Sequence, residues 1–285
     1  MKNKAVVLGS NYYIGLSIIR CLGSKGIYTV AVDYSENDTY GAKSKYLKEQ
    51  LIAPHYKLNP QELLEYLINY AKNEIFKPIL YPSADAYVEF MDNYLNELRE
   101  YYLIPMTEKG IWTSVMDKVE LSEKAIEFGV LIPETVNSSD NNLYSEVETR
   151  IKYPCIVKPT DSPAFSAKFR KKMFLCNDDQ DLKNALNLAR NENLDVFVQR
   201  IIPGEDDNMY TFDAYMNSDS EVTHWVTCRK LRQYPINYGA SVYTEQKYVQ
   251  ELYEISKPFF KALNYKGFGE IEFKKDNKTG KYYLS

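Results

Sequence analysis

The first hundred residues alternate short apolar segments with amphipathic ones, and no other feature of the sequence constrains the fold as strongly. The apolar segments have the length and composition of buried strands, and the segments between them carry apolar side chains at helical spacing. The expected elements are strands at 4–9, 27–33 and 78–81 and helices at 14–22, 60–72 and 84–91. Strands that alternate with helices pair in parallel, so this part predicts an α/β unit with a mostly parallel sheet.

The sequence after about residue 105 has a different pattern, in which longer strands follow one another directly. Polar turns separate these strands, which is typical of antiparallel pairing. We expect helices at 117–128, 179–190 and 245–263, strands at 154–159, 172–176, 196–200, 209–216, 222–231, 268–275 and 281–284, and a polar loop at 160–167. The expected fold class is therefore α/β plus α+β.

Composition excludes several classes of protein. Hydrophobic residues make up 45% and charged residues 26% of the 285, as in an ordinary globular protein. No apolar run reaches the ~18–20 residues of a membrane-spanning helix, and the N-terminus lacks the features of a signal peptide. With 35 basic and 39 acidic residues the net charge is −4, so we expect binding to neither nucleic acid nor membranes.

The four cysteines form no Cys-x-x-Cys pair, and the two histidines are not spaced as metal ligands. Isolated cysteines in apolar segments are typical of reduced thiols, so we expect a cytoplasmic protein without a zinc site. The cysteines are Cys21, Cys155, Cys176 and Cys228, and the histidines are His55 and His224.

A turn after the first strand, residues 9–15, partly matches a dinucleotide-binding motif, and Asp33 ends the next strand. That motif needs a second glycine where the backbone approaches a pyrophosphate, and Asn11 stands there. An NAD(P)-dependent oxidoreductase remains an alternative, but a Rossmann-like layer that binds no nucleotide fits the sequence better.

Several charged residues later in the chain stand where burial would be costly. Lys158 ends an apolar strand, which is unfavourable unless the ammonium faces an anion. Glu270 and Glu272 are two residues apart in a strand, so both carboxylates project from one face and favour a cation between them. Taken singly, each of these residues could also be a solvated surface charge.

Four segments in order carry a resemblance to a known family. They are 117–129, 153–159, 198–204 and 267–273. Their order and spacing resemble the ATP-grasp superfamily of carboxylate–amine ligases. The stretch 229–235, with Gly239 after it, is similar to the branch that contains D-aspartate ligases and carbamoyl-phosphate synthase.

This resemblance implies a Rossmann-like pre-ATP-grasp domain at 1–105, followed by an ATP-grasp fold of two α+β subdomains at 106–195 and 196–285. It implies ATP and Mg²⁺ as cofactors, and small-molecule carboxylate and amine substrates joined through an acyl-phosphate; whether the chain forms a homodimer stays open. The site residues it implies are Lys118 and Lys158 for phosphates, Gln199, the Arg200 carbonyl and the Ile202 amide for adenine, Asp206 or Asp207 for ribose, Glu272 for the metal with Glu270 as a weaker neighbour, and Arg232 for the acyl-phosphate.

The sequence departs from the family pattern in two places. Residues 160–167 lack the glycines of the phosphate-covering flap, so serines and the lysines that follow would contact phosphate instead. The chain stops at Ser285, before the motif that supplies a second metal ligand and an arginine. We therefore expect a piece of a longer enzyme, with a non-catalytic nucleotide-binding relative as the alternative.

Overall fold

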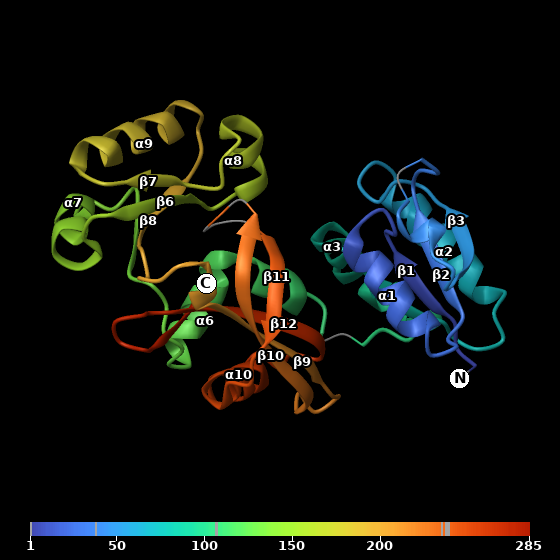
Figure 1. Ribbon diagram of the computed structural model, residues 1–285. Helices are drawn as coiled ribbons and strands as arrows, with labels where there is room; N and C mark the ends of the chain where they lie inside the picture. The colour runs from blue at the N-terminus through green and yellow to red at the C-terminus, as the bar shows by residue number, and fades with distance from the viewer. Residues whose placement is uncertain (1, 38, 106–107, 235, 237–239) are drawn as a thin grey trace. The chain divides into compact units, whose positions relative to one another are not determined.

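The computed structural model describes residues 2–37, 39–105, 108–234, 236 and 240–285 and divides into two compact units, Met1–Met116 and Asp117–Ser285 (Figure 1). The first unit extends past residue 105 because Asp92 holds the segment that follows. Its carboxylate accepts hydrogen bonds from Gly110 N at 2.8 Å and from Thr113 Oγ1 at 2.7 Å. The expected division of the second unit at residue 195 stays a prediction.

The first unit contains the expected parallel sheet, in the order β3-β2-β1-β4. Its central strands β1 and β2 are buried along their whole length, which explains their unbroken apolar sequence. The edge strand β3 was not predicted, because its side chains alternate between half-buried and exposed. The strands are β1 (Ala5–Leu8), β2 (Thr29–Asp33), β3 (Leu47–Ile52) and β4 (Ile79–Pro82), and the helices are α1 (Tyr13–Gly23), α2 (Pro60–Lys72), α3 (Asp85–Asn93), α4 (Leu95–Tyr101) and α5 (Ile111–Met116).

The second unit begins with an antiparallel sheet in the order β5-β8-β6-β7. Figure 1 shows α9 lying along this sheet, and the side chains between them form an apolar core that includes Val157, Leu182 and Val198. The strands are β5 (Thr135–Asn137), β6 (Cys155–Pro159), β7 (Phe174–Cys176) and β8 (Val196–Arg200), and the helices are α6 (Lys118–Glu127), α7 (Leu143–Glu146), a π-helical turn (Val147–Ile151), α8 (Ser162–Phe169) and α9 (Asp179–Asn191).

A second antiparallel sheet, in the order β11-β10-β9-β12-β13, completes this unit. One face packs against α10, where Phe212 meets Phe260 and Trp225 stacks on Tyr253. The opposite face, here called the polar face, carries alternate residues of β9, β10 and β12, among them Asp213, Lys230, Glu270 and Glu272. The elements are β9 (Met209–Met216), β10 (Val222–Tyr234), β11 (Ala240–Gln246), α10 (Gln250–Ala262), β12 (Gly267–Lys275) and β13 (Tyr282–Leu284).

Two expected elements of this unit are wrong. The helix expected from residue 245 begins at Gln250, because 240–246 pair with β10 as strand β11. The expected loop at 160–167 is largely the helix α8. Its N-cap Asp161 accepts a hydrogen bond from Ala164 N at 3.0 Å, and Phe165 is fully buried against Phe169 and Phe174.

Candidate functional site

Two lysines from different elements of the second unit lie within electrostatic reach of each other. Lys158 ends β6, and Lys118 opens α6 directly after its N-cap Asp117. Burial, and to a smaller extent the positive charge of Lys118, lower the pKa of Lys158 to about 8, while Glu272 opposes the change. Lys118 donates a hydrogen bond to Ser162 Oγ at 2.7 Å, and its pKa is also lowered by desolvation and then by Lys172.

Neither ammonium has an acidic partner in the part of the chain that the structure describes. No carboxylate oxygen of those residues lies within 4.0 Å of the Nζ atom of Lys118 or Lys158. Two cations held together without a carboxylate repel each other, and an anion between them would remove that cost. The arrangement is suited to a polyanionic ligand such as a chain of phosphates.

The polar face places a third lysine beside a carboxylate. Lys230 of β10 is 3% exposed, and its ammonium forms an ion pair with Glu272 of β12. The described residues contain no group of three His, Cys, Asp or Glu that could hold a metal ion by themselves. Mg²⁺ commonly uses one or two carboxylates together with substrate phosphates and water, so Glu272 fits the part of a single protein ligand.

A pair of carboxyl groups lies next to this ion pair. Glu270 stands directly opposite Asp213 across the β9–β12 ladder, and Asp213 also accepts a hydrogen bond from Thr211 Oγ1 at 2.7 Å. Burial, the charge of Asp213 and a hydrogen bond between the two raise the pKa of Glu270 to about 8. Glu270 and Glu272 therefore share a face as expected, but each is paired with a different residue.

The turn before β9 holds both candidate ribose ligands in place. Asp206 accepts hydrogen bonds from Gln233 N at 3.0 Å and Nε2 at 2.8 Å, while Asp207 Oδ2 accepts from Arg229 Nη2 at 2.6 Å. Gly204 precedes them with φ +138°, a backbone conformation that other residues rarely adopt. Both acids lie in the turn directly before β9, and the geometry favours neither.

The side chains that end β8 contact the neighbouring strands. Arg200 donates to both oxygens of Glu134, at 3.1 and 3.0 Å, and to Asp276 Oδ2 at 3.3 Å. Gln199 Nε2 donates to Thr135 Oγ1 at 3.0 Å. These contacts fix the end of the strand and occupy the guanidinium of Arg200. Only the backbone of Arg200 would therefore be available to bind a base.

Ile202 follows β8 with a buried side chain, 5% exposed. Among the residues that the structure describes, none accepts a hydrogen bond from its backbone N–H. The next residue, Pro203, accepts a hydrogen bond from Asn277 N at 3.0 Å, which fixes the turn. A fixed N–H without an acceptor is a suitable donor for a ring nitrogen of a purine.

Arg232 is not brought to these residues by any contact in the described chain. It is exposed and lies where the β10–β11 register is irregular. Pro235 and Gly239, which belong to the same sequence motif, lie outside the described residues. The role of Arg232 stays a prediction.

In the first unit, the carboxylate of Asp33 takes part in local hydrogen bonds. Its carboxylate accepts hydrogen bonds from Ser10 N and Ser10 Oγ, both at 2.6 Å, and is 3% exposed. A Cβ at Gly15 would stand 2.1 Å from Gly9 O, so this glycine serves close packing of helix and strand. The partial dinucleotide motif is thus explained by local packing.

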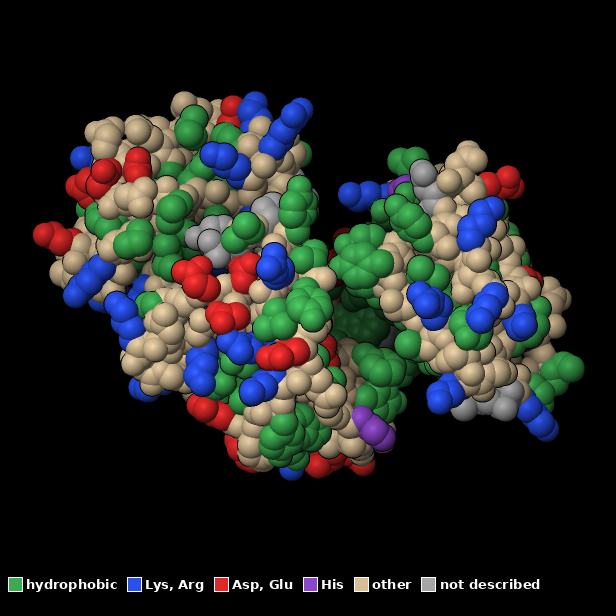
Figure 2. Space-filling view, viewed as in Figure 1, with side chains coloured by type: hydrophobic (Ala, Val, Ile, Leu, Met, Phe, Trp, Pro, Cys, Tyr) green, Lys and Arg blue, Asp and Glu red, His purple; other side chains and the backbone are tan. Residues whose placement is uncertain are grey.

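Sequence reasoning missed the carboxylate of Asp213, and it placed Lys230 beside Arg232 without foreseeing the ion pair of Lys230 with Glu272. Both stand in strands that were predicted. In β9 a lone carboxylate among mostly apolar residues was the available signal, whereas β10 is mixed in polarity and offered none. Figure 2 shows acidic and basic side chains interleaved on the visible side of this unit.

Comparison with known proteins agrees with this geometry. Residues 116–285 match the family described as D-ala D-ala ligase C-terminus. D-aspartate ligase from Enterococcus faecium (strain Aus0004) is 27% identical over 218 residues, which cover 73% of this chain and 52% of that protein. The chain thus spans about half the length of this relative.

Solved structures share the fold at low identity. N5-carboxyaminoimidazole synthetase from Staphylococcus aureus, solved with ADP, superimposes with a TM-score of 0.69 at 14% identity, over 100% of this chain and 70% of that one. L-amino acid ligase from Bacillus licheniformis gives a TM-score of 0.65 at 11% identity, over 100% and 66%. The matched family model covers more than half of the chain, and the chain belongs to the D-ala D-ala ligase C-terminal family, with the ATP-grasp fold.

Proposed function

We propose that this chain is the nucleotide-binding part of an ATP- and Mg²⁺-dependent ligase that joins a carboxylate to an amine. A substrate carboxylate attacks the γ-phosphate of ATP, ADP leaves, and the amine then displaces phosphate from the acyl-phosphate to form an amide. Family membership and the likeness to D-aspartate ligase support this reaction class and favour an amino acid or peptide as substrate. Bound Mg²⁺ would offset phosphate charge.

The observation that carries the proposal is the approach of Lys118 and Lys158 without an acidic partner among the described residues. Together they bind the phosphates, while Glu272 holds the metal after its ion pair with Lys230 opens. The Ile202 amide and Arg200 carbonyl bind adenine beside Gln199, Asp206 or Asp207 binds ribose, and Arg232 stabilises the acyl-phosphate.

Calorimetric titration with a non-hydrolysable ATP analogue, with and without Mg²⁺, tests this site. Wild type should bind in a metal-dependent manner, and Lys158→Ala should weaken binding at least about tenfold, because a charge-assisted phosphate contact is lost. Lys183→Ala is the matched control, since Lys183 is exposed on α9. Equal affinity of Lys158→Ala and wild type would refute the assignment.

We also propose a cytoplasmic location. No helix of the described residues is long and apolar enough to cross a membrane. All four cysteines are free thiols, including Cys155 and Cys176, which stand opposite each other on neighbouring strands. Reduced thiols so placed fit a reducing compartment.

A further inference from the structure

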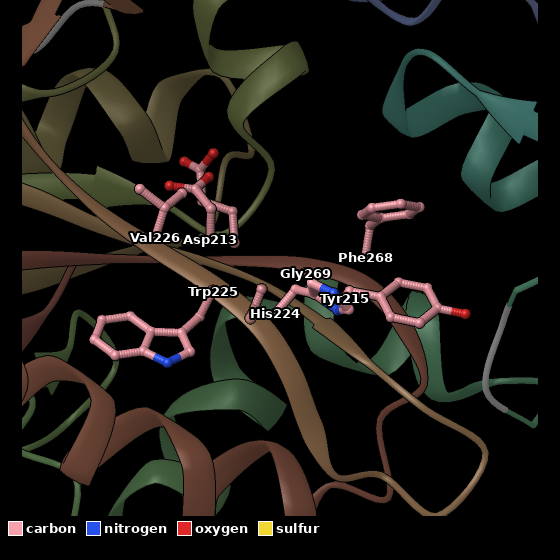
Figure 3. Close-up of a pocket in the computed structure, with 9 residues that line it drawn as sticks. Asp213, Tyr215, His224, Trp225, Val226, Phe268 and Gly269 are labelled. Carbon is pink, nitrogen blue, oxygen red and sulfur yellow. The ribbon is translucent and has the colours of Figure 1, made fainter. Parts of the chain in front are cut away.

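An open, shallow cavity of about 530 Å³ lies on the second sheet of the second unit, beyond the Lys230–Glu272 ion pair. Strands β9, β10 and β12 supply its walls. Figure 3 shows Asp213, Val226 and Phe268 projecting from one face of the sheet, while the ring of Trp225 lies on the other. The cavity therefore continues the polar face along the strands.

The order of the candidate ribose and metal ligands along these strands indicates which end of a bound nucleotide would reach the cavity. The ribose candidates Asp206 and Asp207 lie at the start of β9, and the metal candidate Glu272 pairs with Thr211 further along. Glu270 follows one strand step later and Phe268 one step beyond, each step being about 7 Å. A nucleotide bound in this direction would point its terminal phosphate toward the cavity.

The charge of the cavity discriminates between the two substrates of a ligase. Asp213 and Glu270 stand side by side in its lining, and the negative charge carried by this pair favours a cation and repels an anion. No lysine or arginine is among its described lining residues, and the basic group there is His224. A free carboxylate would therefore be disfavoured in this space, whereas an ammonium group would be attracted.

The far wall of the cavity is aromatic. The rings of Tyr215 and Phe268 lie 4.9 Å apart, and Phe268 is 61% exposed although it is a large apolar side chain. Aromatic faces attract cations and also pack against alkyl groups. The wall thus complements an organic cation better than a hydrated metal ion.

We propose that this cavity binds the amine substrate of the ligase, with Asp213 and Glu270 facing its ammonium group and Tyr215 and Phe268 packing against the attached carbon chain. The inference rests on the proposed function, since it assigns one of the two substrates of that reaction. Asp213 and Phe268 then determine specificity for an amine that arrives next to the acyl-phosphate.

Saturation-transfer NMR at pH 7 tests this with two probes of equal size and opposite charge, n-butylammonium and butyrate. We expect a signal for n-butylammonium and none for butyrate. Asp213→Asn with Glu270→Gln should weaken n-butylammonium binding at least about tenfold, because the negative charge of the pair is removed. The matched control is Glu251→Gln with Glu254→Gln, on exposed positions of α10 at the opposite face.

Phe268→Ala, at an exposed position, provides a second variant that should fold and should weaken binding about threefold. Equal binding by wild type and the double variant, equal binding of both probes, or complete displacement by Mg²⁺ alone would overturn the inference. Titration of wild type with the ATP analogue separates the two proposals. If the analogue binds and n-butylammonium does not, only the amine site falls; if the analogue does not bind, both fall.

Discussion

Replacing Lys158 by methionine should stabilise the free protein while impairing nucleotide binding. The half-buried ammonium lies at the end of β6 within electrostatic reach of Lys118, and its pKa falls from 10.5 to about 8. That difference means that the folded state holds the proton less strongly than the unfolded chain does. Methionine keeps the length of the side chain and removes the charge, so the cost of burying the charge disappears.

The size of the effect follows from the two pKa values of Lys158. At about 1.4 kcal/mol for each tenfold change in proton affinity, the charged lysine destabilises the fold by at most about 3 kcal/mol at pH 7. Because the folded pKa lies below the unfolded one, the unfolded chain binds more protons between these values, and wild-type stability rises with pH in that window. The expected advantage of the variant therefore shrinks to about 1 kcal/mol at pH 9.5.

Urea denaturation of wild type and Lys158→Met at pH 7 and pH 9.5 measures this difference directly. Calorimetry should show that wild type binds the ATP analogue less well above pH 8, because the ammonium of Lys158 loses its proton. The variant should bind more weakly than wild type at pH 7, and its affinity should lack this pH dependence. A variant that is less stable than wild type at pH 7, or a stability difference that does not change with pH, would refute the reasoning.

Three further substitutions test other parts of the second unit. Arg200→Ala should lower the free energy of unfolding in urea by about 2 kcal/mol, since it leaves the buried carboxylate of Asp276 without its cation; a change below about 0.5 kcal/mol would contradict this. Gly204→Ala should lower the free energy of unfolding by about 1–3 kcal/mol and weaken binding of the ATP analogue, because φ is +138° and the new Cβ would lie 2.7 Å from Asn208. Unchanged calorimetric affinity would argue against a role for this turn in nucleotide binding. Cys155→Ala should lower stability by about 1–2 kcal/mol and leave nucleotide affinity unchanged, since the thiol is fully buried; an affinity loss in calorimetry would count against the assigned site.

Much of the fold could be predicted locally. The parallel strands β1 and β2 are apolar throughout because both faces are buried, and α6 begins after Asp117, whose carboxylate accepts hydrogen bonds from the first turn. The short edge strand β3 and the helix α8 were missed, because alternating or mixed polarity over so few residues is compatible with a loop. The half-buried lysine at the end of β6 could also be predicted, since an ammonium at the end of an apolar strand is unfavourable unless it faces an anion.

The sequence by itself thus determined which residue types stand at the end of each strand. Those residues carried the family resemblance, and the resemblance implied the reaction class. Only the tertiary structure decided how the charges pair. Glu272 meets Lys230 across 42 residues of sequence, and Glu270 meets Asp213 instead of a shared cation. These partners depend on the register of three strands, and register is set by packing of the whole sheet against α10, which no local pattern records.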